Sequence, residues 1–189
     1  MLSDLQPLTF ASLEYSLISL VISFNKLKLV RYDTFNRLSR LEELHLEYNE
    51  IESIESNSFD DMSNLKAIYL NNNKLSRFVS TLSNLFNLKT IYMQNNEQLT
   101  SLEARSFNEL TNVDFISLDE CQISQIELNS FSNLPNLKIL SLLFNKIQRL
   151  KRGIFTNLTK LKKLQLHQNE ISQIESNAFV NMIQLGEYK

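Results

Sequence analysis

The chain of 189 residues has no tryptophan, one cysteine, two glycines and two prolines. With glycine only at Gly153 and Gly186, it cannot form the glycine-rich loops that bind nucleotide phosphates. A single cysteine, Cys121, excludes an internal disulfide framework and a zinc site built from several cysteines. No stretch approaches the roughly 18 apolar residues of a membrane-spanning helix. Residues 1–15 also lack the basic residues of a secretory signal. We therefore expect no cofactor and no transmembrane segment in this chain.

Leucine and asparagine are abundant instead, with 34 and 22 copies, and both recur at a fixed period. Markers spaced by 23 to 25 residues are Asn25, Asn49, Asn73, Asn96, Cys121, Asn145 and Asn169. The same apolar frame surrounds each of them, as in Leu41-x-x-Leu44-x-Leu46-x-x-Asn49-x-Ile51. This period predicts one repeat domain over 1–189. It has a half repeat at 1–16, full repeats starting at 17, 41, 65, 88, 113, 137 and 161, and a truncated repeat from 185.

This frame resembles the leucine-rich repeat family, whose motif is L-x-x-L-x-L-x-x-N/C-x-L, and the resemblance covers essentially the whole chain. A 24-residue repeat with a phenylalanine is similar to the subtype found in extracellular leucine-rich proteins and Toll-like receptor ectodomains. The resemblance implies an α/β repeat fold. This fold is a right-handed solenoid, or horseshoe, with a concave parallel sheet and an irregular or short helical convex side.

The physics of the frame supports the same fold. In L-x-L the two leucines lie on one face of a strand and the residue between them points to the other face. Each coil then supplies one short strand, and coils stack about 4.8 Å apart into a parallel sheet. No coil can bury its leucines alone, so stability comes from neighbouring coils.

The marker residues are expected to form a buried ladder where the chain leaves each strand. An asparagine side chain both donates and accepts hydrogen bonds, so it can satisfy the backbone groups of adjacent turns. Cys121 fills the fifth rung and is expected to be a buried structural thiol rather than a reactive one. A second column is predicted to stack as an aromatic spine in the core; it contains Phe35, Phe59, Leu82, Phe107, Phe131, Phe155 and Phe179.

Strand residues that do not enter the core are candidates for partner binding on the concave face. His45, Tyr69 and Tyr92 occupy the fifth position of adjacent repeats, and exposed tyrosines are typical of binding hot spots. A second apolar group contains Phe115, Ile139, Leu143 and Phe144. The predicted partner-binding residues are His45, Glu47, Tyr48, Tyr69, Tyr92, Phe115, Asp119, Leu143 and Phe144. The alternative is that these are scattered surface residues without a ligand.

Charge is uneven along the chain although the net charge is −2. Residues 42–61 are acidic without lysine or arginine, and residues 146–163 are basic without aspartate or glutamate. The basic residues lie outside the strands and no aromatic residues interleave with them, so we expect a solvated face and no nucleic acid partner. The unequal ends would also favour head-to-tail contacts between copies.

Catalytic and metal sites are not expected. His45 and His167 are five coils apart, about 24 Å at the strand spacing of a sheet, and Cys121 lies at least two coils from either histidine. No set of histidine, cysteine or carboxylate residues has ligand spacing, so no metal site is predicted.

Asn157-Leu158-Thr159 is the one acceptor sequence for N-glycosylation. The chain begins and stops within a repeat and has no cysteine-rich caps, which predicts a fragment of a longer array or self-association through uncapped ends.

Three functions remain open. The first is a non-enzymatic recognition module of an extracellular or cell-surface receptor, for signalling, adhesion or innate recognition, that binds a protein on its concave face. The second is an intracellular, cytoplasmic scaffold or adaptor that holds other domains. The third is a self-assembling array.

Overall fold

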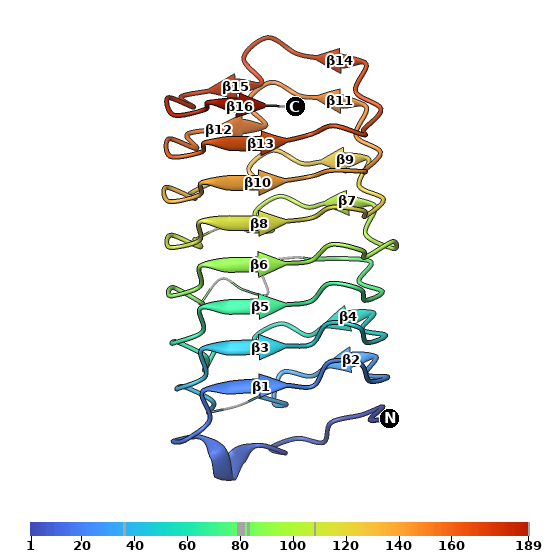
Figure 1. Ribbon diagram of the computed structural model, residues 1–189, viewed down its shortest axis with the longest axis vertical. Helices are drawn as coiled ribbons and strands as arrows, with labels where there is room; N and C mark the ends of the chain where they lie inside the picture. The colour runs from blue at the N-terminus through green and yellow to red at the C-terminus, as the bar shows by residue number, and fades with distance from the viewer. Residues whose placement is uncertain (36, 79–81, 83, 108, 189) are drawn as a thin grey trace.

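The computed structural model describes residues 1–35, 37–78, 82, 84–107 and 109–188. One short strand recurs in every coil, and the strands stack into a single parallel sheet along the molecule (Figure 1). This confirms the predicted solenoid. In spatial order the strands are β1 (Ser19–Val21), β3 (Glu43–His45), β5 (Ala67–Tyr69), β6 (Thr90–Tyr92), β8 (Phe115–Ser117), β10 (Ile139–Ser141), β13 (Lys163–Gln165) and β16 (Glu187–Tyr188).

Register in this sheet keeps equivalent repeat positions side by side. Leu44 of β3 pairs with Leu20 and Ile68 of its two neighbours, and Tyr69 pairs with His45 and Tyr92. The middle residue of each three-residue strand points into the core, so a slip of one residue would expose every one of these apolar side chains. Register is therefore fixed by burial.

Most coils also carry very short strands away from this sheet, and these were not anticipated. They pair two by two, in parallel, as β2 (Leu29–Val30) with β4 (Ser53–Ile54), β7 (Ser101–Leu102) with β9 (Gln125–Ile126), β11 (Arg149–Leu150) with β14 (Gln173–Ile174), and β12 (Phe155–Thr156) with β15 (Phe179–Val180). The only helix in the described part of the chain is a 3-10 turn at Ala11–Leu13. The convex side is otherwise irregular.

Leucine and phenylalanine columns fill the core between these two sides. Leu41, Leu44 and Leu46 are fully buried, and so are their equivalents in the next four coils. Phenylalanine rings of adjacent coils stack with centroids 5.5–6.2 Å apart in the pairs Phe35–Phe59, Phe107–Phe131, Phe131–Phe155 and Phe155–Phe179. Such contacts add to the hydrophobic free energy of burial.

In the third coil, the large and the small core residue have exchanged columns. Leu82 stands in the phenylalanine column, and Phe78 stands in a column that holds Val30 and Ile54 in earlier coils. Both Leu82 and Phe78 are buried, and the Phe78 ring lies 5.2 Å from Phe107. The larger side chain therefore continues the spine from a different position, and core volume is preserved.

Candidate binding face

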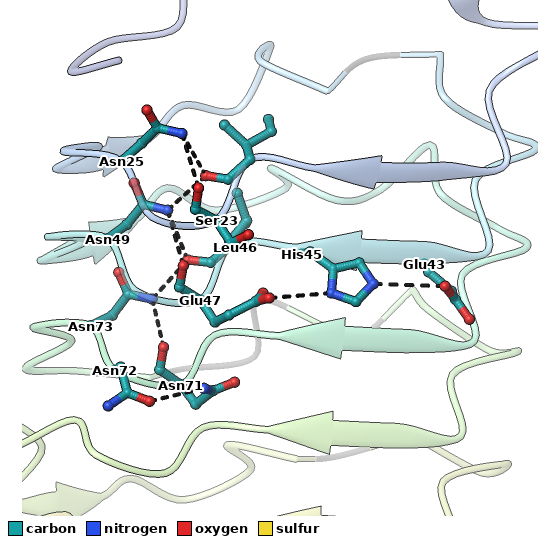
Figure 2. Close-up of polar contacts among 11 residues, drawn as sticks. Ser23, Asn25, Glu43, His45, Leu46, Glu47, Asn49, Asn71, Asn72 and Asn73 are labelled. Carbon is teal, nitrogen blue, oxygen red and sulfur yellow. Dashed lines mark hydrogen bonds and ion pairs between the residues drawn. The ribbon is translucent and has the colours of Figure 1, made fainter. Parts of the chain in front are cut away.

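The asparagine column closes the turn at the end of each strand (Figure 2). Nδ2 of Asn73 donates to the carbonyl oxygens of Leu46 and Leu70, both at 3.0 Å, and its Oδ1 accepts from the Ile51 amide at 2.9 Å. Asn49 makes the equivalent bonds one coil earlier, to Ile22, Leu46 and Leu27. Equivalent contacts are made by Asn96, Asn145 and Asn169, whereas Asn25 bonds within its own turn and accepts from Leu2. One side chain thus joins two coils at each rung.

Cys121 occupies the fifth rung with a weaker contact. Its Sγ lies 3.5 Å from the Met93 carbonyl oxygen and the residue is fully buried. The preceding repeat has one extra residue, and in that turn the Leu99 amide donates to the Asn96 carbonyl oxygen at 2.9 Å. In the other coils, the equivalent amide donates to the asparagine side chain of the next rung. Here the local turn supplies the acceptor instead. Burial raises the pKa of the Cys121 thiol to about 12, which keeps it protonated and unreactive.

A second asparagine column was missed in the sequence. It lies just before the first leucine of the repeat, and each Nδ2 donates to a carbonyl oxygen one coil earlier: Asn64 to Ser39, Asn87 to Ser63, Asn112 to Phe86 and Asn136 to Thr111, at 2.6–2.8 Å. Arg40 fills this position in an earlier coil and donates to Tyr15. A period of 23 to 25 residues between these asparagines is the signal that reveals the column.

Position eight, the residue before the first asparagine column, has a left-handed backbone in every full repeat. The φ angles of Phe24, Tyr48, Asn72, Asn95, Glu120, Phe144 and Gln168 lie between 53° and 59°. Asparagine tolerates this conformation, but bulky side chains adopt it rarely. Three of these turns nevertheless carry an aromatic residue, at a cost in backbone free energy. These residues are exposed: Phe24 by 63%, Tyr48 by 46% and Phe144 by 51%.

A row of stacked rings crosses the centre of the concave face, which we define as the outward positions three, five, seven and eight of each repeat. His45 and Tyr69 stack with centroids 4.1 Å apart, and Tyr69 and Tyr92 with centroids 4.8 Å apart. Phe115 continues the row, tilted by 45° against Tyr92 at 5.2 Å. All four side chains are half-buried. Since each belongs to a different strand, the row spans β3, β5, β6 and β8.

Carboxylates surround the first ring of this row. His45 lies between Glu43 and Glu47, with Nε2 3.7 Å from one carboxylate and Nδ1 3.4 Å from the other (Figure 2). Burial raises the pKa of the Tyr69 phenol, and Tyr92, Glu43 and Glu47 add to the effect. The phenol therefore remains a neutral hydroxyl group that can both donate and accept a hydrogen bond.

The remaining predicted residues lie in two further places. Tyr48 stacks on Phe24 with centroids 4.4 Å apart, at the edge of the face next to β1 and β3. Phe144 meets the edge of His167 at 6.1 Å, beside the half-buried Leu143. The apolar group around Phe144 and the row through Tyr69 therefore belong to one sheet but to different coils.

Asp119 has structural contacts rather than a free carboxylate. Its Oδ1 accepts from the Ser141 hydroxyl at 2.6 Å and the Leu143 amide at 2.8 Å, and Oδ2 accepts from Ser117 at 3.2 Å. These bonds join β8 to β10 and explain how two serines are buried on an outward-facing position. The negative charge of Asp119 remains on the concave face, but both of its carboxylate oxygens already accept hydrogen bonds within the protein.

Asn157 is exposed and has a φ of 59°. Its Oδ1 accepts from Asn181 Nδ2 at 2.8 Å, a contact that does not use the amide nitrogen to which an N-linked glycan is attached. The residue borders a surface hollow of about 670 Å³ that also includes Leu134, Pro135 and Thr159.

The residues considered for catalysis remain apart. His45 lies in β3, His167 follows β13, and Cys121 is buried between them in the sheet order. Within the described ranges, no group of three or more histidine, cysteine, aspartate or glutamate residues is placed to hold a metal ion. The same ranges contain no helix that is long and apolar enough to cross a membrane.

Comparison with known proteins supports this description. The family model described as "Leucine rich repeat" matches residues 15–75, 86–147 and 135–186, whereas no curated protein matches the chain. Among solved structures, the complex of TLR13 with ssRNA13 has a TM-score of 0.66 and 25% identity over 90% of this chain and 27% of the other.

Two structures of the Drosophila Toll–Spatzle complex are also similar. The glycosylated form has a TM-score of 0.72 and 23% identity over 80% of this chain and 22% of the other. The other structure has a TM-score of 0.70 and 21% identity over 94% of this chain and 27% of the other. The chain therefore spans about a quarter of the length of the structures it matches.

Proposed function

The chain belongs to the leucine-rich repeat family, and on that basis we propose that it is a non-enzymatic recognition module that binds a protein partner on its concave face. The observation that carries this proposal is the continuous row of rings from His45 through Tyr69 and Tyr92 to Phe115. Half-buried aromatic side chains lose little conformational entropy when a partner covers them, and tyrosine adds a polar tip.

Backbone strain supports the same face. Phe24, Tyr48 and Phe144 place large exposed rings at left-handed turns where the other repeats have asparagine, glutamate or glutamine. A position that costs stability and buries little apolar surface in the free protein is explained most simply by contact with a partner.

The proposed setting is the ectodomain of an extracellular or cell-surface receptor. The similar structures are TLR13 in complex with an RNA and Toll in complex with the protein Spatzle. The exposed side chain of Asn157 in the acceptor sequence is compatible with passage through the secretory pathway. Glycan occupancy at Asn157, checked by the loss of mass after enzymatic deglycosylation, would favour this setting over a cytoplasmic scaffold.

Site-specific photo-crosslinking tests the proposed face. A photoreactive phenylalanine analogue is placed at Tyr69 or, as a control, at Tyr32, an exposed tyrosine outside the concave sheet. The protein is then applied to intact cells of its source, and adducts are identified by mass spectrometry. We expect a protein adduct from position 69 that is absent from position 32.

A companion variant, Tyr92→Ala, should abolish that adduct while thermal unfolding stays cooperative, because Tyr92 contacts Tyr69 on the outward side of the sheet. Equal yields from positions 69 and 32 would contradict a concave binding face. An RNA adduct in place of a protein adduct would reject a protein partner.

A further inference from the structure

Negative charge collects on the concave face although the chain is nearly neutral. Across β1, β3, β5, β6, β8 and β10, the outward positions three, five, seven and eight all lie in described residues. They carry the carboxylates Glu43, Glu47, Asp119 and Glu120 and neither lysine nor arginine. The first basic residue at such a position is Lys163 in β13. The net charge of −2 therefore conceals a face that carries acidic residues in two of its coils and no lysine or arginine over six consecutive strands.

Charges at the margins of the sheet behave differently, because they are neutralised between adjacent coils. Lys66 pairs with Glu42 at 2.8 Å and Lys138 with Asp114 at 3.0 Å, just before the strands. Lys74 pairs with Glu50 at 3.0 Å on the other margin. These lysines are paired with carboxylates at the margins of the sheet. They therefore do not neutralise the carboxylates of the concave face.

Hydrogen-bond acceptors on this face also lack donors. Glu47 Oε2 and Gln94 Oε1 are buried atoms without a hydrogen-bond partner in the described structure. They stand at the seventh position of the His45 and Tyr92 coils, which flank the coil of Tyr69. A buried acceptor without a donor costs free energy, and a small rotation of either side chain would present it to a bound group.

We propose that the partner segment bound over β3, β5 and β6 is basic, with arginine or lysine side chains that reach Glu43, Glu47 and Gln94 while its apolar parts cover the edges of the stacked rings. This inference rests on the proposed function of the concave face and adds the chemistry of the partner. A guanidinium group supplies five donors in one plane, which suits a surface rich in acceptors.

Ring geometry agrees with such a segment better than with a nucleic acid. His45, Tyr69 and Tyr92 cover one another's faces at 4.1 and 4.8 Å, so the faces on which nucleic acid bases stack are occupied. The carboxylates would also repel a phosphate backbone. The same charges attract a basic peptide and accelerate its association.

A randomised peptide-display library tests the proposal on the intact chain. Peptides that bind the wild-type protein are divided into those that require Tyr69 and Tyr92, shown by loss of binding to a Tyr69→Ala/Tyr92→Ala variant, and those that do not. We expect the first group to be enriched in arginine and lysine relative to the library. Glu43→Gln/Glu47→Gln should weaken their binding about fivefold, as expected for partly exposed ion pairs.

The matched control is Glu52→Gln/Asp60→Asn, which removes the same charge from two exposed residues outside the concave sheet. It should change the affinity by less than about twofold if the carboxylates act through direct contact. Tyrosine-dependent peptides that are neutral or acidic, or equal effects of the two double variants, would overturn the basic partner and leave the concave binding face standing.

Two further outcomes bear on the proposed function itself. If no selected peptide depends on Tyr69 and Tyr92, the face is not a binding site and the inference falls with it. A single-stranded RNA oligonucleotide is added as a competitor, and we expect no displacement of the peptides at physiological salt. If RNA binds the wild-type protein and this binding is lost in the Tyr69→Ala/Tyr92→Ala variant, the partner is a nucleic acid and not a basic peptide.

Discussion

Asparagine occupies three kinds of position in the repeat, and each position uses a different property of the residue. Six asparagines form the ladder, buried at its four central asparagines, where donor and acceptor are used together. Four form the second column, where the amide donor bonds to the preceding coil and, at Asn136, the oxygen also accepts from Lys160. Eight adopt a left-handed backbone, which asparagine tolerates better than other non-glycine residues. Because the chain has only two glycines, asparagine fills many of the left-handed turn positions that favour glycine.

The two hydrogen-bonded columns should differ in their contribution to stability. Asn73→Ala leaves the Ile51 amide without a buried partner and removes one of the two asparagine donors from each of the Leu46 and Leu70 carbonyl oxygens, and we expect the free energy of unfolding to fall by about 2 kcal/mol. Asn87→Ala, in the exposed column, removes one bond to Ser63 and should cost about 1 kcal/mol or less. Urea denaturation of both variants measures the difference; equal losses would mean that burial of the ladder is not decisive.

We expect the Cys121 thiol to be unreactive in the folded protein. Its folded pKa of about 12 lies above the usual value of 9.0, so the stability associated with the protonated thiol is complete below pH 9 and is lost as the pH rises toward 12. We expect no reaction with a thiol-specific disulfide reagent at pH 8 and full reaction after unfolding. Cys121→Ala serves as the control in denaturation at several pH values. Rapid labelling of the native protein would show that Cys121 is accessible.

The turn after each strand is the element in which stability and binding compete. Phe144 has a φ of 53° and is half exposed, whereas asparagine fills the same position as Asn72 and Asn95. A bulky residue in this conformation carries a cost of about 1 kcal/mol or more. The aromatic turns are thus places where the repeat departs from its most stable sequence, as binding sites often do.

A reciprocal pair of substitutions tests this cost. Phe144→Asn should raise the free energy of unfolding by about 1 kcal/mol, because the backbone strain is relieved and little buried apolar surface is lost. Asn95→Phe should lower it by a similar amount at the equivalent turn of another coil. Thermal unfolding followed by circular dichroism measures both. A loss of stability in Phe144→Asn would show that the ring packs more firmly than its exposure indicates.

The elements of the concave sheet could be predicted because burial of a period-two pattern leaves one register for each strand. Position five of every repeat, including Tyr69 and Tyr92, lies side by side with its neighbours as the repeat spacing requires. The role of Asp119 could not be predicted, because it depends on a rotamer that brings one carboxylate to two serines and an amide. Sequence spacing places a residue on a face but does not show which of its atoms are already bonded.

The position of Phe78, where other coils have a smaller core residue, could not be predicted for a related reason. Core packing conserves volume rather than position, so a ring that moves to another column keeps the spine intact and breaks the pattern. The paired strands of the convex side arise from main-chain bonds between loops, to which side-chain periodicity is blind. The second asparagine column, by contrast, had a clear periodic signal.

At the scale of the whole molecule, stability is a sum of coils and of contacts between neighbours. Residues of one strand pair only with those of the strands beside it, and the large apolar side chains stack along the same direction. A binding face that spans four strands therefore depends on several interfaces at once. Damage in one coil should misalign the row from His45 to Phe115 without unfolding distant coils.

Ile91→Ala tests this locality. Ile91 is fully buried in β6, and its truncation leaves a cavity that should cost about 3 kcal/mol, whereas Ile91→Val should cost about 1 kcal/mol. Hydrogen exchange measured by mass spectrometry should show faster exchange in β5, β6 and β8, which contact the cavity, and little change in β13. Because Tyr92 follows Ile91 directly, binding at the ring row should weaken together with this protection. Uniform acceleration across all strands would mean that the solenoid unfolds as one cooperative unit rather than coil by coil.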